Sequence, residues 1–175
     1  MMISLLVGCN ANVVKDEDSV FYAVAVGSTL VLNQQVDIRG DQVAIYVQNG
    51  ELKQYNEVNF YLPNCKFEIY TISEQPRTVA PDSFKIVKVV DDIESSSLQK
   101  ELRVAALGRA FFASGFDRSY VFNYATLMYL NSDKQKDVYR MTCQHWEDIV
   151  DDRHLSITQM RAAMGDVFTL QTLKN

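Results

Sequence analysis

The length and composition of the chain indicate one globular domain. Of its 175 residues, 47% are hydrophobic and 22% are charged, and the formal net charge is −5. This balance excludes a disordered tail and a coiled coil. Lysines and arginines are scattered, which excludes a phosphate-binding stripe and makes nucleic acid an unexpected partner. No apolar run approaches the roughly 20 residues that a membrane-spanning helix needs.

The first nine residues carry the pattern of a bacterial lipoprotein signal. In Leu6-Val7-Gly8-Cys9, small and aliphatic residues precede a cysteine whose thiol would take diacylglycerol. Residues 1–8 are short for such a signal and lack a basic start, and a start site placed too far downstream would explain both defects. The alternative is an ordinary buried strand that contains a cysteine.

The lipoprotein interpretation sets the expected organisation and location. Residues 1–8 would be a truncated signal, 9–19 a polar tether and 20–175 a single β-rich domain. The chain would reach the membrane only through a lipid on Cys9. Because Asn10 is not the aspartate that retains lipoproteins in the inner membrane, we expect the periplasmic side of the outer membrane.

Most of the domain shows strand patterns. Asn49-Gly50 stands between two short β-branched or alternating runs and predicts a tight hairpin. The segment 120–130 has apolar residues on both faces, which is typical of a central strand covered on both sides. Strands are predicted over 28–32, 43–48, 51–55, 66–72, 84–90, 120–130, 137–143 and 167–173.

Two segments depart from the strand pattern. Ser156, Gln159 and Gly165 supply a capping box and a glycine stop, which predict a short helix between them. Residues 97–116 have apolar spacing that fits an amphipathic helix, but their glycines and adjacent phenylalanines fit a loose loop equally well. The predicted fold is mainly β: a small sandwich or partly open barrel of six to eight strands, with a short helix near the C-terminus.

The three cysteines favour one disulfide. If Cys9 is acylated in an oxidising periplasm, Cys65 and Cys143 are the pair that remains. Strand parity places Cys65 with Phe67 and Ile69 on the core face, with Lys66 and Glu68 facing water. The same parity groups Cys143 with Tyr139 and Met141, opposite Arg140 and Thr142. The alternative is two unbridged core thiols.

These landmarks resemble a family of uncharacterised proteobacterial lipoproteins and exported envelope proteins. The stretches that carry the resemblance are Gly27-Ser28-x-Leu30, Ile45 to Gly50, Tyr61 to Glu68, Phe122 to Thr126, Met141 to Cys143 and the terminal helix. The resemblance covers most of residues 20–170. It implies a small β-rich envelope protein, and it implies no activity.

The richest polar stretch runs from Gln144 to His154. It holds both histidines, His145 and His154, and four carboxylates, which could ligate Zn²⁺ or Ca²⁺. Its spacing matches neither a His-x-x-x-His helix nor an EF-hand, so a solvated connection between a strand and a helix is expected instead. No serine lies in Gly-x-Ser-x-Gly and no glycine-rich phosphate loop is present. We therefore expect no catalytic residue, no metal and no cofactor.

Two groups of aromatic residues are candidates for a docking surface. Phe111, Phe112 and Phe116 lie in the apolar segment, and a second group surrounds Pro63. Core packing is the simpler interpretation of both groups; an exposed surface for another envelope protein or for the bilayer is the other. The function expected is a lipid-anchored periplasmic interaction or assembly protein. The alternatives are a soluble binder of small hydrophobic ligands near Phe111-Phe112, and a metal-assisted hydrolase in the loop from His145 to His154.

Overall fold

The computed structural model describes residues 16–21, 23–96, 121–148 and 153–173. Ten strands, one 3₁₀ helix and one α-helix lie within these residues. They are β1 (Thr29–Leu32), β2 (Val36–Ile38), β3 (Ala44–Gln48), β4 (Glu51–Lys53), η1 (Tyr55–Glu57), β5 (Asn64–Ile69), β6 (Arg77–Val79), β7 (Asp82–Ser96), β8 (Val121–Asn131), β9 (Val138–Asp148), α1 (Ile157–Met164) and β10 (Phe168–Gln171).

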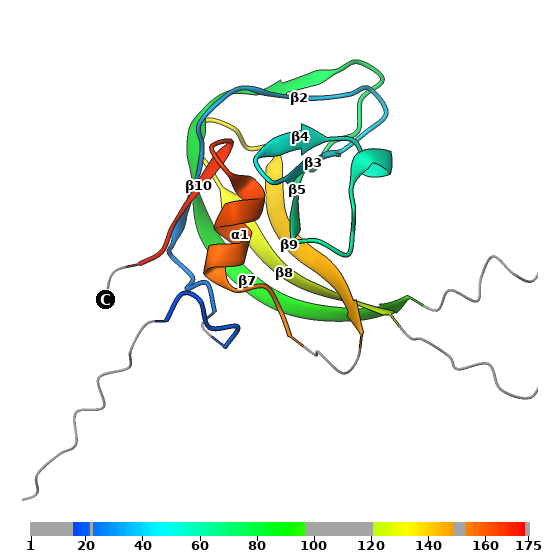
Figure 1. The fold of residues 1–175 in the computed structure, drawn as a ribbon. Coiled ribbons are helices and arrows are strands. Elements are labelled where there is room, and N and C mark those ends of the chain that lie inside the picture. The colour runs from blue at the N-terminus through cyan, green and yellow to red at the C-terminus, as the bar shows by residue number, and fades with distance from the viewer. Residues whose placement is uncertain (1–15, 22, 97–120, 149–152, 174–175) are drawn as a thin grey trace, which may run out of the picture.

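Eight strands form one curled antiparallel sheet in the order β10-β1-β7-β8-β9-β5-β3-β4. The long strands β7, β8 and β9 bend around α1, which lies inside the curve (Figure 1). The sheet therefore forms a half-barrel whose concave side holds the helix, which confirms the predicted mainly β, partly open barrel with a short helix near the C-terminus. The small sheet of β2 and β6 was not predicted, because each of its strands has only three residues.

The predicted hairpin and helix both form as their local signals indicate. Asn49 and Gly50 have φ values of 53° and 76°, so both turn residues adopt the left-handed conformation that a tight hairpin needs. At the start of α1, the Ser156 hydroxyl accepts from the Gln159 backbone N–H at 3.2 Å. The Gln159 side chain in turn accepts from the Ser156 N–H at 2.9 Å.

The end of α1 closes the open side of the half-barrel against the hairpin turn. The Gly50 N–H donates to the Ala163 carbonyl at 3.0 Å. A Cβ placed on Gly165 would lie 2.4 Å from the Gly50 Cα, closer than any real contact allows. Gly165 also has a φ of 52°, which disfavours other residues. Two glycines at one crossing therefore bring the helix end and the hairpin into backbone contact.

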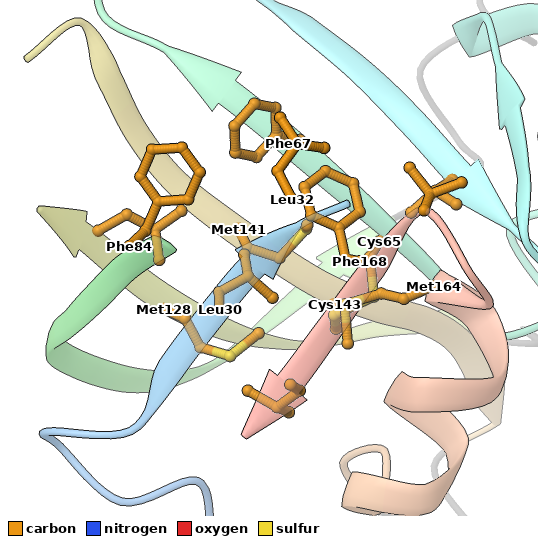
Figure 2. Packing of buried hydrophobic residues seen from close by; sticks show 14 of the residues in the cluster. Leu30, Leu32, Cys65, Phe67, Phe84, Met128, Met141, Cys143, Met164 and Phe168 are labelled. Atoms are coloured by element: carbon orange, nitrogen blue, oxygen red, sulfur yellow. A yellow bond between two sulfur atoms is a disulfide. The ribbon is translucent and has the colours of Figure 1, made fainter. Parts of the chain in front are cut away.

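The core fills the space between α1 and the sheet (Figure 2). The Phe67 ring lies 6.0 Å from that of Phe84 and 5.1 Å from that of Phe168, measured between centroids. Met128 and Leu130 of β8 also point into this core, whereas Leu127 and Tyr129 on the outer side are only half-buried. β8 is therefore central, as predicted, but only its concave side is covered by the core.

The first described residues dock on α1. The Glu17 carbonyl accepts from the Thr158 N–H at 3.2 Å. The Glu17 carboxylate pairs with Arg161 and accepts from the Thr172 hydroxyl at 2.8 Å. These bonds, that from Arg161 foremost, lower the pKa of Glu17. The stretch 16–19, at the end of the predicted tether, thus packs on the domain, while residues 9–15 lie outside the described residues.

β9 is longer than the sequence suggested. The expected solvated connection after Cys143 is wrong for its first five residues, since β9 continues to Asp148 in register with β8. Gln144 and His145 are buried within it. The strand pairing of β8 overrides the polar composition here, because each polar backbone group finds a partner in the neighbouring strand. Residues 97–120, whose structure was left open as helix or loop, lie outside the described residues.

Candidate functional site

A row of outward-facing side chains crosses four strands on the outer face of the sheet, the side opposite α1. The register places Lys88 of β7 opposite Tyr129 of β8, Tyr129 opposite Arg140 of β9, and Arg140 opposite Glu68 of β5. Because residues in register share one face of a sheet, these four side chains are neighbours. The row joins residues that are up to 72 positions apart in the chain.

A β-bulge adds a tyrosine to this row. Glu68 pairs with Arg140, but the next residue, Ile69, pairs with Val138, so Tyr139 is the extra residue in β9. Val138 is consequently buried and Tyr139 turns to the outer face. The predicted placement of Tyr139 on the core face with Met141 is therefore wrong. The bulge reverses the alternation of core-facing and outward-facing residues at this point, and no local sequence signal predicts the bulge.

Three tyrosines and two cations pack against one another on the outer face. The Tyr139 ring centroid lies 4.4 Å from that of Tyr70 and 5.5 Å from that of Tyr129. The Lys88 ammonium sits 5.0 Å from the Tyr129 centroid, and the Arg140 guanidinium 4.9 Å from that of Tyr139. These are cation–π distances. We call Tyr70, Lys88, Tyr129, Tyr139 and Arg140 the cation–tyrosine ladder.

A buried carboxylate, that of Glu68 in the same row, holds the ladder residue Arg140 in place. Glu68 is 8% exposed and accepts from Arg140 at 2.5 Å, from Lys66 at 2.9 Å and from the Thr142 hydroxyl at 3.1 Å. The expectation that Glu68 faces water is therefore wrong, because Lys66 of the same strand and Arg140 of the adjacent strand enclose it. Burial acts to raise the pKa of Glu68, but the bonds from Arg140 and Lys66 outweigh burial and the pKa is lowered. The carboxylate in turn raises the pKa of Arg140.

A second aromatic group lies farther along the outer face, on β3, β9 and the loop before β5. Phe60 stacks on Trp146 with centroids 5.0 Å apart, and Tyr61 meets Trp146 edge-on at 5.6 Å. Tyr55 and Tyr61 are 64% and 56% exposed, so this group around Pro63 is only partly core. Tyr46 lies beneath it, and burial, with smaller effects of Tyr55 and Glu68, raises its pKa to about 12.

Cys65 and Cys143 form the predicted disulfide. They are register partners on β5 and β9, are 0% and 1% exposed, and face the core beside Phe67 and Met141 (Figure 2). The parity argument placed both cysteines correctly because Cys143 and Met141 both lie beyond the bulge. The bond joins β5 to β9 on the core face, three residues along each strand from the Glu68–Arg140 pair.

The two histidines pack around a tyrosine. The ring centroids of His145 and His154 lie 6.1 Å and 5.7 Å from that of Tyr124. The Nε2 atoms contact the carbonyl oxygens of Arg153 at 3.0 Å and of Asp92 at 3.2 Å. A carbonyl only accepts, so each Nε2 carries the proton and donates. Within the described ranges, no three His, Cys, Asp or Glu side chains gather in a form that could hold a metal ion.

A shallow cavity of about 280 Å³ lies beside His154, between residues 20, 21, 23 and 24 on one side and the start of α1 on the other. Asp91 and Thr126 supply polar groups to it, and the Thr126 hydroxyl donates to the Asp91 carboxylate at 2.8 Å. The ligand site expected near Phe111-Phe112 is a separate prediction, which the described residues do not test. Phe111, Phe112, Phe116 and the predicted lipid-attachment residue Cys9 all lie outside the described residues.

Comparisons with known proteins give no match to a family model, a curated protein or a solved structure. The resemblance to exported envelope proteins thus stays a prediction. Among the helices in the described residues, none has the length and apolar character needed to cross a membrane.

Proposed function

We propose that this chain is a lipid-anchored, non-catalytic interaction or assembly protein of the bacterial envelope. Cys9 would carry the lipid, on the periplasmic side of the outer membrane, and the outer face of the sheet would contact another envelope protein. The proposal joins two independent features: the disulfide, which bears on the compartment, and the exposed aromatic face, which bears on the activity.

The disulfide is the observation that carries the proposal. Disulfides persist in the periplasm and other oxidising compartments, and are rare where glutathione and thioredoxin keep thiols reduced. Cys65 and Cys143 are bonded to each other, which leaves Cys9 as the one cysteine of the three outside this bond. An unpaired cysteine in an exported protein needs a chemical reason, and acylation at the end of Leu6-Val7-Gly8-Cys9 supplies one.

The exposed tyrosines support an interaction role. Tyr55, Tyr61 and Tyr70 are each more than half exposed, and all three belong to the outer face or its rim. Tyrosine combines a large apolar ring with a polar tip and is enriched at protein interfaces. A single exposed tyrosine needs no explanation, but three on one face, backed by Trp146 and by the ladder, form a surface that a partner could cover.

Localisation of a Cys9→Ser variant in the native host tests the proposal. The gene keeps its own upstream DNA, and the wild-type protein should stay with the outer-membrane fraction through a high-salt, alkaline wash. The variant should lose this retention, because a serine hydroxyl cannot form the thioether to diacylglycerol. An Asn12→Ser variant is the matched control, since it places a serine three residues from Cys9, leaves all three cysteines in place and should remain membrane-bound. Equal retention of wild type and Cys9→Ser, or a cytosolic wild type, would contradict the proposal.

A further inference from the structure

We infer that the cation–tyrosine ladder is the docking surface for an acidic protein, and that it faces away from the leaflet holding the lipid anchor. This inference deepens the proposed function, because its orientation argument rests on anchoring at Cys9. The charge, exposure and shape of the ladder support the docking role itself.

The ladder is a positive region on an acidic protein. Lys66, Lys85, Lys88 and Arg140 all face outward here, around the carboxylate of Glu68. The outward-facing acids of β7, Asp92 and Glu94, lie four and six residues farther along that strand from Lys88. The chain as a whole carries −5. Asp137, at the rim near Tyr70, is already paired with Arg77. Such a local surplus of positive charge attracts an acidic surface and speeds its encounter with the protein.

The side chains of the ladder are those that dominate protein interfaces. Tyrosine and arginine are enriched among the residues whose truncation costs most binding energy. Tyr70 is 61% exposed, and Val87, the exposed residue beside Lys88, is 48% exposed. The ring contacts and the Glu68 bonds already hold Tyr139 and Arg140 in place. A partner would therefore immobilise few side chains, which lowers the entropy cost of binding.

The shape of the outer face favours a macromolecule over a small ligand. α1 occupies the concave side of the sheet, so the ladder lies on the convex side (Figure 1). Small-molecule sites are concave and enclose most of the ligand. A convex face can instead be covered by a flat or hollowed surface of a larger partner.

The anchor geometry favours a protein over the anchoring membrane. Six residues separate Cys9 from Asp16, so the anchor lies within about 25 Å of the first described residue even in a fully extended chain. That residue precedes Glu17, which docks on α1 through Thr158 and Arg161. The tether therefore leaves from the helix side of the molecule. The outer face, on the other side of the sheet, then points away from the anchoring leaflet.

Titration with an acidic peptide tests the inference. The probe is a dodecapeptide of alternating glutamate and alanine, with a glutamine–alanine peptide as the neutral control. It is added to the full-length Cys9→Ser chain and followed by amide chemical shifts. The shifts should cluster on β7, β8, β9 and the residues around Tyr70, the affinity should fall with added salt, and the neutral peptide should cause no comparable change.

Two substitutions and a matched control make the test specific. Lys88→Glu should weaken peptide binding at least about tenfold, and Tyr70→Ala several-fold, because both side chains are exposed parts of the ladder. Lys134→Glu makes the same charge change on a lysine whose side chain is 84% exposed, on the β8–β9 turn. It should leave binding within about twofold of wild type. Unfolding curves of all three variants check that the fold is intact.

Several results would overturn the inference. Shifts that map away from the ladder, or equal losses in Lys88→Glu and Lys134→Glu, would show that only overall charge matters. Lys88-dependent binding to phosphatidylglycerol vesicles without peptide binding would assign the face to a membrane. The assay needs no lipid on the protein, so its failure is separate from failure of the Cys9 anchor. Peptide binding by a chain that is never acylated would retain the docking surface and overturn only its orientation.

Discussion

Removal of the disulfide should cost a large share of the protein's stability. Cys65 and Cys143 are 78 residues apart, and the chain-entropy model gives about 4.5 kcal/mol for closing a loop of that length. Replacing both by alanine also leaves small voids in the core, which add roughly 1 kcal/mol or more. The double variant Cys65→Ala/Cys143→Ala should therefore lose about 5 kcal/mol, a substantial part of the 5–15 kcal/mol typical of a domain.

The single tryptophan provides the assay. Trp146 stacks on Phe60, so its fluorescence should report unfolding in guanidinium chloride under non-reducing conditions. Reduced wild-type protein lacks the bond but not the sulfur atoms, and should lose about 4 kcal/mol. Cys9→Ala removes the third thiol and should leave the midpoint unchanged. A double variant within about 1 kcal/mol of wild type would refute the reasoning, because the loop would then not be constrained by the bond.

Three further substitutions, with Gly27→Ala as a control for the first, test the packing and the charges. Gly165→Ala should destabilise by roughly 3 kcal/mol in the guanidinium chloride titration, since its Cβ would meet the Gly50 backbone. Gly27 also has a positive φ, but a Cβ there would meet only a flexible leucine side chain, so Gly27→Ala should lose about 1 kcal/mol in the same titration. Ser156→Ala should cost about 1 kcal/mol of thermal stability through the lost cap, and no change in melting temperature would contradict that assignment. Glu68→Gln should cost about 2 kcal/mol at neutral pH. Because the folded pKa of Glu68 is lowered, its contribution is present above the ordinary glutamate pKa and is lost as pH falls through the folded value, so the difference from wild type should shrink in acid. A constant difference across pH would contradict the lowered pKa.

Local signals in the sequence predicted the elements that depend on neighbouring residues alone. Asn49 and Gly50 are compatible with positive φ wherever they stand, so the hairpin could be predicted from two residues. The Ser156 capping box likewise lies within one turn of helix. The cysteine pairing was also accessible, because strand parity put both thiols on the core face.

The candidate docking surface could not be predicted in the same way. It depends on the bulge that turns Tyr139 outward, and on Glu68 meeting Arg140 across 72 positions of sequence. Strand parity assumes a regular pleat, and a single extra residue reverses it. A carboxylate in an alternating strand also looks solvated until its cationic neighbour on the adjacent strand, here Arg140, is known. Long-range register, not local propensity, assembles the cation–tyrosine ladder.

The intact mass of the untagged protein tests the central claim most directly. The protein should be extracted without reduction from the membranes of its native host, with the gene's own upstream DNA in place. The account predicts a chain that begins at Cys9, carries acyl groups there, and lacks the two hydrogens of a Cys65–Cys143 disulfide. A chain that begins at Met1 with three free thiols would contradict both the anchor and the oxidising compartment.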